Sequence, residues 1–156
     1  MSALPTEVAP YFRPMQQGDI EGVIDIERRV YEFPWTIGIF QDCMRIGYVC
    51  RVFESQSDVI GYGIMSVGSG ECHILNVCVV PHSQGRGLGR LMVDSLITIA
   101  KRNKVRIAFL EVRLSNTRAF ELYSGMGFNE IGRREDYYPA SGGARESALV
   151  LAKMLY

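Results

Sequence analysis

The sequence predicts an α/β (α+β) fold, with one mixed, mostly antiparallel sheet of about seven strands flanked by about four helices. The first observation is size, since 156 residues with 47% hydrophobic side chains can bury one full core. The second is a pair of strand-like runs joined by the short polar segment 55–58, as in an antiparallel hairpin. The third is a strand–helix–strand–helix order over residues 71–126. We therefore expect a single domain over residues 1–156.

Each element is expected from its own residue pattern. β-Branched and aromatic runs predict strands at Tyr11–Arg13, Tyr48–Glu54, Val59–Val67, Glu71–Val80, Arg106–Arg113, Phe128–Tyr138 and Glu146–Tyr156. Helical spacing of apolar residues predicts helices at Ile20–Tyr31, Ile37–Arg45, Leu88–Lys101 and Thr117–Met126. Asp19, Thr36 and Asn116 are the expected N-caps, and Gly127 ends the last helix. Residues 1–10 hold two prolines and no periodicity, which predicts a loose tail.

The charge balance and the cysteines limit the function. The chain has 17 basic and 17 acidic residues, which argues against nucleic-acid binding because that usually needs a basic face. Its four cysteines form no C-x-x-C pair, so we expect reduced, mostly buried thiols and no metal site. No signal-peptide pattern and no apolar run of membrane-spanning length is present. We expect a soluble, cytoplasmic protein without a membrane partner, and a monomer.

The segment 74–90 carries the strongest functional signal. A buried-strand pattern ends at Pro81, and glycines follow at positions 85, 87 and 89 before an amphipathic helix. Free N–H groups and the positive end of a helix dipole meet at such a turn, and the missing side chains let a phosphate approach the backbone. Arg86 and Arg90 add positive charge. We interpret the turn as a pyrophosphate cradle; the alternative is a turn that only lets strand and helix pack closely.

Two other phosphate-binding motifs do not fit this turn. The dinucleotide fingerprint G-x-G-x-x-G fails because Arg90 stands where the third glycine belongs. The P-loop fails because no Gly-Lys-Ser/Thr follows.

Two polar residues later in the chain occupy apolar positions. In a strand, Glu111 shares a face with Ile107 and Phe109, and partial burial there would raise its pKa and make it a better base near neutrality. The alternative is a strand-end carboxylate that reaches water or pairs with Arg113. Tyr123 lies on an apolar helix face, where most tyrosines are core residues whose hydroxyl has found a partner. From the residues alone, both alternatives stay open.

Longer motifs around these residues are specific. The runs Leu110-Glu111-Val112-Arg113-x-Ser115-Asn116 and Ala119-Phe120-x-Leu122-Tyr123-x-x-x-Gly127-Phe128 resemble the bacterial RimI branch of the GNAT acetyltransferase superfamily. Gln84-x-x-Gly87-x-Gly89 resembles the acetyl-CoA pyrophosphate motif of that superfamily, and Phe33-Pro34-Trp35-Thr36 and Arg133-Arg134-x-x-Tyr137-Tyr138-Pro139 also agree. The resemblance covers residues 11–156. It implies the GNAT fold, acetyl-CoA as cosubstrate without a metal, and acetylation of the N-terminal alanine of a small-subunit ribosomal protein.

The resemblance also implies roles for single residues. Glu111 is similar to the family's general base, which acts directly or through water, and Tyr123 is similar to the general acid that protonates the CoA thiolate. Contacts with the cofactor are implied for Val77, Cys78, Val79, Gln84, Gly85, Arg86, Gly87, Leu88, Gly89 and Asn116. We expect the substrate peptide to be gripped by aromatic side chains on two connections, namely Phe33, Trp35, Tyr137 and Tyr138. The alternative for Phe33 and Trp35 is that they only plug helix ends.

Two rival functions remain. One is a GNAT enzyme that acetylates a small amine or a lysine, and the other is a non-catalytic acyl-CoA-binding module with structural Glu111 and Tyr123. An α-amine has a pKa of roughly 7.7–8.0 and a lysine of about 10.4, so a carboxylate base suits an N-terminal acceptor better. Direct transfer is expected, because no histidine is placed to activate Cys78 as a nucleophile.

Overall fold

The structure is a computed structural model that describes residues 9–156. Its strands are β1 (Tyr11–Pro14), β2 (Val49–Ser55), β3 (Asp58–Gly68), β4 (Glu71–Val79), β5 (Ile107–Arg113), β6 (Asn129–Pro139) and β7 (Arg145–Met154). Its helices are α1 (Ile20–Val30), α2 (Ile37–Ile46), α3 (Leu88–Arg102) and α4 (Thr117–Gly125). The predicted α/β (α+β) class is confirmed, and each predicted element is present. Most of the predicted tail, residues 1–8, lies outside the described part.

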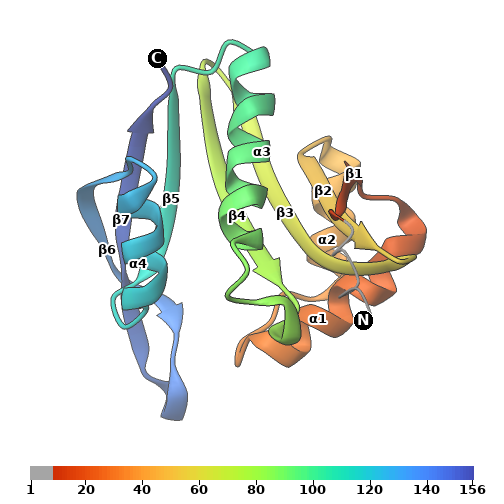
Figure 1. Cartoon of the computed structure of the whole chain (residues 1–156). Coiled ribbons are helices and arrows are strands. Elements are labelled where there is room, and N and C mark those ends of the chain that lie inside the picture. Colours follow the sequence, from red (N-terminus) through yellow and green to blue (C-terminus); the bar gives the residue numbers. More distant parts are fainter. Residues whose placement is uncertain (1–8) are drawn as a thin grey trace, which may run out of the picture.

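One sheet runs through the structure (Figure 1) in the order β1-β2-β3-β4-β5-β7-β6. Every neighbouring pair is antiparallel except β4 and β5, which are parallel. The predicted hairpin joins β2 and β3 through Gln56 and Ser57, whose φ angles of 50° and 70° match the right-handed twist of the flanking strands. The mixed, mostly antiparallel sheet is therefore confirmed.

β4 and β5 separate soon after they begin. Within residues 9–156 they pair only between Glu71–His73 and Ile107–Phe109, although β4 continues to Val79 and β5 to Arg113. Figure 1 shows the two strands diverging between α3 and α4. The divergence creates two strand edges in the middle of the sheet, where backbone N–H and C=O groups can meet a ligand.

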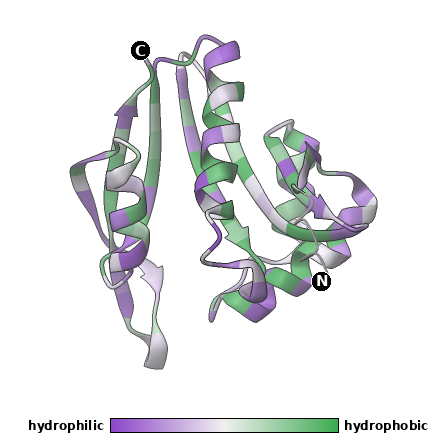
Figure 2. Cartoon of the chain, viewed as in Figure 1, coloured by the Kyte–Doolittle hydropathy of each residue, from purple (hydrophilic) through white to green (hydrophobic). Residues whose placement is uncertain are grey.

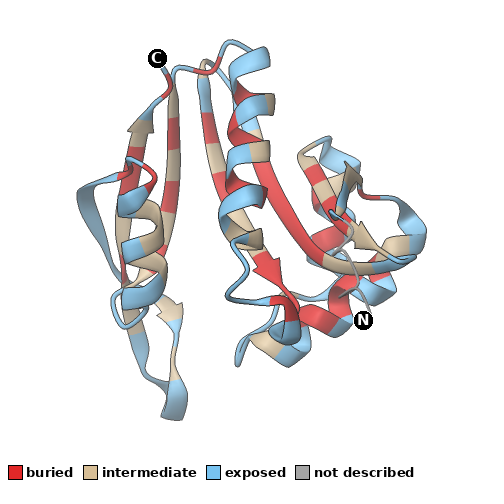
Figure 3. Cartoon of the chain, in the orientation of Figure 1, coloured by how far each residue is buried: buried red, intermediate tan, exposed pale blue. Residues whose placement is uncertain are grey.

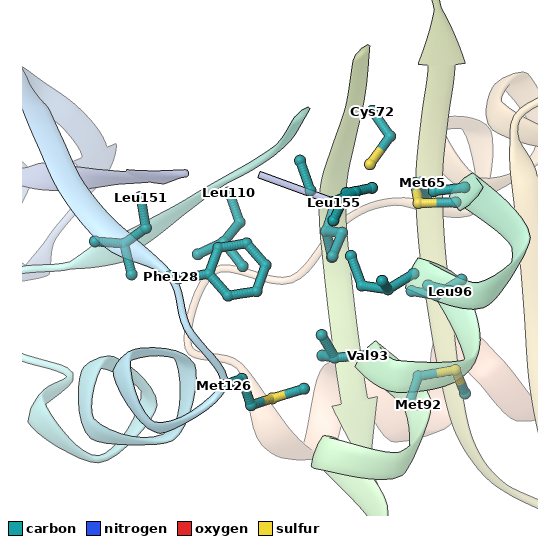
Figure 4. Close-up of a cluster of buried hydrophobic side chains, with 14 of the residues drawn as sticks. Met65, Cys72, Met92, Val93, Leu96, Leu110, Met126, Phe128, Leu151 and Leu155 are labelled. Atoms are coloured by element: carbon teal, nitrogen blue, oxygen red, sulfur yellow. The ribbon is translucent and has the colours of Figure 1, made fainter. Parts of the chain in front are cut away.

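Two apolar clusters lie on opposite faces of the sheet. The first packs α3 and α4 onto β3, β4, β5 and β7 (Figure 4), and it includes the buried Met92 and Leu96 of α3. The second packs α1 and α2 onto the other face. Alternation along β3 explains the division, because Ile64 belongs to the second cluster and its neighbour Met65 to the first. Figure 2 shows the same alternation as bands along the central strands.

The two ends of the sheet differ in how they are covered. Helices pack on both faces of β3 and β4, α3 from one side and α1 from the other. The outer strand β6 is exposed at every position except Tyr138, which is half-buried (Figure 3). The face of β5, β7 and β6 opposite α4 is therefore open to solvent or to a ligand.

Two of the three predicted helix caps are confirmed. The Ile39 N–H donates to Thr36 Oγ1 at 3.3 Å, and the Ala119 N–H donates to Asn116 Oδ1 at 3.1 Å. Asp19 occupies the predicted N-cap position of α1, but its side chain makes no capping hydrogen bond to that helix. It closes the preceding 3₁₀ turn η1 (Gln17–Asp19) by accepting from the Gln16 N–H at 2.7 Å. It also pairs with Arg13 at 2.8 Å, and that hydrogen bond lowers the pKa of Asp19.

The cysteines behave as predicted. All four (Cys43, Cys50, Cys72 and Cys78) are free and buried. Burial raises the pKa of Cys78 to about 11, so its thiol stays protonated near neutrality. None of the helices in residues 9–156 is long and apolar enough to cross a membrane.

Candidate active site

The glycine-rich turn links the end of β4 to the start of α3. After the 3₁₀ turn η2 (Pro81–Ser83), Gly85 and Gly87 adopt positive φ angles of 81° and 77°, and Leu88 begins the helix. A Cβ atom added at Gly85, Gly87 or Gly89 would meet no heavy atom within 4 Å. Close packing of strand against helix therefore does not require these glycines. Gly89 has neither a positive φ nor a close neighbour, so neither the backbone conformation nor packing in the fold requires a glycine there.

Some backbone groups of β4 face away from β3, toward the edge where β5 has separated. The Val80 N–H donates to Ile60 O on β3, and Cys78 on β4 pairs with Tyr62, which also belongs to β3. Because hydrogen bonding alternates along an antiparallel pair, Val77 and Val79 direct their backbone groups toward the edge that β5 has left. The Gln84 side chain donates to Val79 O at 3.0 Å and so ties the turn back to this edge. Of the three β4 residues predicted to hold the cofactor, Val77 and Val79 thus lie on the free edge.

Glu111 lies on β5 with its carboxylate fixed from two sides. One oxygen accepts from Arg134 Nε on β6 at 3.1 Å, and the other is hydrogen-bonded to His73 Nε2 on β4. The side chain is only 7% exposed. The alternative that Glu111 pairs with Arg113 is excluded, since Arg113 pairs with Glu146 at 3.1 Å.

The prediction that burial raises the pKa of Glu111 is wrong. Burial alone does act upward, but the hydrogen bond to His73 and the positive charge of Arg134 outweigh it, and the pKa is lowered. The carboxylate is thus firmly ionised near neutrality. No local sequence signal indicates this, because both partners come from other strands.

Tyr123 projects from α4 into the first apolar cluster. Its ring packs edge-on against Phe128, with ring centroids 5.9 Å apart. Burial raises its pKa to about 12, which keeps the hydroxyl protonated near neutrality. Burial raises the pKa of Tyr31 and of Tyr138, and the charge of Tyr123 raises both further. The carboxylate of Glu111 also raises the pKa of Tyr138. That Tyr123 and Glu111 act at one site stays a prediction.

A second carboxylate, Glu27 on α1, was missed from the sequence. It is 1% exposed and accepts hydrogen bonds from the Tyr62 hydroxyl, from Asn76 Nδ2 at 3.1 Å and from the Trp35 N–H at 3.2 Å. These bonds join α1, β3, β4 and the α1–α2 connection. A signal was available, because Glu27 follows Ile20 by seven positions and so falls on the apolar stripe of the helix.

Tyr31 was also missed and reaches the edge of β4. Its hydroxyl donates to Val77 O at 3.1 Å. Enclosure of this hydroxyl raises the pKa of Tyr31 well above its usual value, with Cys78 and Glu27 nearby. A tyrosine hydroxyl thus lies beside the main chain that was predicted to hold the acyl group.

The four aromatic residues predicted to grip a peptide lie on two segments that meet. The guanidinium of Arg113 lies 6.0 Å from the centroid of the Phe33 ring and 4.4 Å from that of Tyr138. Ser141 Oγ in the β6–β7 connection donates to Glu32 Oε1 at 2.8 Å. The two segments therefore face each other across one end of the site.

Two details of this aromatic group differ from expectation. Tyr137 and Tyr138 lie within the end of β6 instead of on a connection. Trp35 packs against the buried Phe40, with centroids 5.2 Å apart, whereas Phe33 stays 38% exposed. This packing supports the alternative role for Trp35, which closes the second apolar cluster, and leaves Phe33 accessible.

Asn116 lies at the start of α4, where its side-chain oxygen caps the helix. Its predicted contact with the cofactor stays a prediction. Within the described residues, no group of three or more His, Cys, Asp or Glu side chains could hold a metal ion.

Sequence comparisons with known proteins also point to an acetyltransferase. A sequence profile of the acetyltransferase (GNAT) family matches residues 20–128. The chain is 34% identical over 134 residues to the [ribosomal protein bS18]-alanine N-acetyltransferase of Haemophilus influenzae, covering 86% of this chain and 91% of that protein. It is 33% identical over 138 residues to the Escherichia coli enzyme of the same name, covering 88% and 93%.

Comparison of the fold with solved structures also finds an N-acetyltransferase. The crystal structure of the ribosomal-protein-S18-alanine N-acetyltransferase from Escherichia coli superimposes with a TM-score of 0.87 and 31% identity, covering 94% of each chain. Profile, sequence and fold thus agree on the same family. The chain belongs to the acetyltransferase (GNAT) family.

Proposed function

We propose that this protein is an acetyl-CoA-dependent N-terminal acetyltransferase that acetylates the N-terminal alanine of ribosomal protein bS18 by direct transfer. The observation that carries the proposal is the position of Glu111, an ionised carboxylate held by Arg134 and His73 where β4 and β5 separate. Its relatives of known function act on this ribosomal protein. We further propose that it works in the cytoplasm as a monomeric single domain.

The residues present fit acetyl-CoA. The cradle Gln84–Gly89 offers open space over three glycines at the N-terminus of the 15-residue helix α3, which suits a pyrophosphate. The Val77 and Val79 main chains would hold the pantetheine and acetyl groups, and one of their N–H groups would stabilise the oxyanion. Acetyl-CoA supplies the activated acyl group.

The remaining residues divide the proton chemistry between them. Glu111 takes a proton from the incoming ammonium, and Tyr123 protonates the departing thiolate. A free α-amine, at roughly 7.7–8.0, loses its proton far more easily than a lysine, at about 10.4. The lowered pKa of Glu111 strengthens this preference, because a weaker base has more difficulty with a lysine. Phe33, Tyr137 and Tyr138 would hold the extended peptide.

One assay separates this function from its rivals. Release of CoA is followed with a peptide that begins with a free alanine and with its N-blocked twin that contains lysine. We expect fast turnover of the first peptide only. Comparable turnover of the blocked peptide or of a free polyamine would identify a lysine or small-amine acetyltransferase, and binding of acetyl-CoA without turnover would identify a binding module.

A further inference from the structure

A groove beside Glu111 is not used by the transfer described above. It has a volume of about 630 Å³ and is lined by residues of β3 to β7, His73, Glu111 and Arg134 among them. Glu111 alternates along β5 with Leu110 and Val112, which are buried beneath α3 and α4. The groove therefore lies on the opposite, open face of the sheet, where it connects Glu111 with solvent.

His73 joins Glu111 to this groove. His73 and Phe109 form the last pair that β4 and β5 share before they separate, and the His73 side chain is hydrogen-bonded to Glu111, two residues further along β5. The His73 side chain is 29% exposed and that of Glu111 only 7%. The His73 side chain is thus in wider contact with water than the Glu111 carboxylate.

Few charged groups surround His73. Glu111 comes from β5, Arg134 from β6 and Glu71 from β4 itself, all three along the groove. Ser66 on β3 and Phe109 on β5 lie directly opposite His73, and β7 contributes Val150. Among these groups, the imidazole of His73 is the one with two separate ring nitrogens, so it can take a proton from Glu111 at Nε2 and release another at Nδ1.

The stoichiometry of the reaction requires such an exit. In N-acetylation, the C–N bond forms and the C–S bond breaks, and the nitrogen of the ammonium loses two protons. One proton ends on the CoA sulfur, and the other has to reach solvent. A carboxylate with a lowered pKa is a poor final acceptor for that second proton.

We propose that His73 relays this proton from Glu111 to solvent through the groove. The inference rests on the proposed function, since it assumes an amine acceptor beside Glu111. Glu111 is the base that touches the ammonium, and His73 acts through it. A purely structural His73 would only hold the carboxylate in place.

Two substitutions distinguish the relay from the structural role. His73→Gln keeps a nitrogen donor at the position of Nε2 but cannot carry a proton. His73→Ala leaves room for added imidazole. We expect both variants to lose on the order of 10–10²-fold in kcat/KM at neutral pH, with a changed pH profile and unchanged acetyl-CoA affinity. Added imidazole should restore His73→Ala but not His73→Gln.

His82 provides the matched control, because it is the only other histidine in the chain. His82→Gln should keep the wild-type pH profile and show no response to imidazole. The relay is overturned if His73→Gln matches wild type across the neutral range, or if His73→Ala fails to respond to imidazole. Each variant is compared with wild type on whichever acceptor wild type uses, so failure of wild type on the alanine peptide would refute only the proposed function.

Discussion

The parts of the sheet on either side of the β4–β5 separation use their polar residues differently. In the first part, β1 to β4 with α1 to α3, helices cover both faces of β3 and β4, and the carboxylate of the buried Glu27 accepts hydrogen bonds only from within the protein. In the second part, β5 to β7 with α4, one face is open and Glu111 is held at its margin. The comparison suggests that the first part supplies rigidity and the second supplies access. The proposed reaction centre lies where they meet.

The largest effect is expected at the carboxylate of the open part. Glu111→Gln keeps the shape and removes the base, so kcat should fall by roughly 10²–10⁴, the usual contribution of one positioned proton-transfer group. Acetyl-CoA affinity, measured by calorimetry, should stay unchanged. Turnover within a few-fold of wild type would mean that the ammonium loses its proton elsewhere.

The carboxylate of the covered part should show the opposite behaviour. Glu27→Gln removes a charged acceptor shared by Tyr62, Asn76 and Trp35, and hydrogen bonds to charged groups contribute roughly 1.5–3 kcal/mol. We expect a loss of unfolding free energy of this order in urea, with kcat reduced far less than in Glu111→Gln. If stability holds while kcat collapses, Glu27 belongs to the chemistry and the comparison fails.

Much of this arrangement was predictable from the sequence. Local periodicity and turn residues were enough for every strand and helix, because those signals depend on near neighbours. The glycine-rich turn was recognised for the same reason, as a motif contained in one segment, whereas the role of Tyr123 came from the family resemblance and stays a prediction. The partners of Glu111 were not recognised, since His73 and Arg134 come from β4 and β6 and meet it only through strand pairing. The direction of the Glu111 pKa shift was wrong for that reason.

A substitution at Gly89 in the cradle tests whether this glycine is needed for binding a ligand or for the fold. Gly89→Val adds a branched side chain where no protein atom lies within 4 Å and where φ is not positive, so the fold should be kept. We expect acetyl-CoA affinity to fall at least about tenfold, which is roughly 1.4 kcal/mol, and Gly89→Ala to have a smaller effect. Unchanged affinity in a folded Gly89→Val variant would refute the phosphate assignment.

Tyr123 tests whether a residue of the apolar cluster also takes part in the reaction. Tyr123→Phe removes one oxygen and keeps the edge-on contact with Phe128. A catalytic hydroxyl predicts a kcat several-fold or more below wild type with nearly normal melting. A hydroxyl that only stabilises the fold predicts a loss of about 1 kcal/mol and normal kcat. A loss of stability with normal kcat would show that Tyr123 has only a structural role.

The smallest effect concerns the open face itself. Ile64 on β3 is fully buried and Ile131 on β6 is 58% exposed, so the same change to valine probes both parts of the sheet. Ile64→Val should cost roughly 0.5–1.5 kcal/mol, because it leaves a small cavity in a packed cluster. Ile131→Val should stay within about 0.5 kcal/mol of wild type, as exposed substitutions do. If both variants lose the same stability in urea, something covers Ile131 in solution. A second copy of the chain would make that loss depend on protein concentration, and the expectation of a monomer would then be wrong.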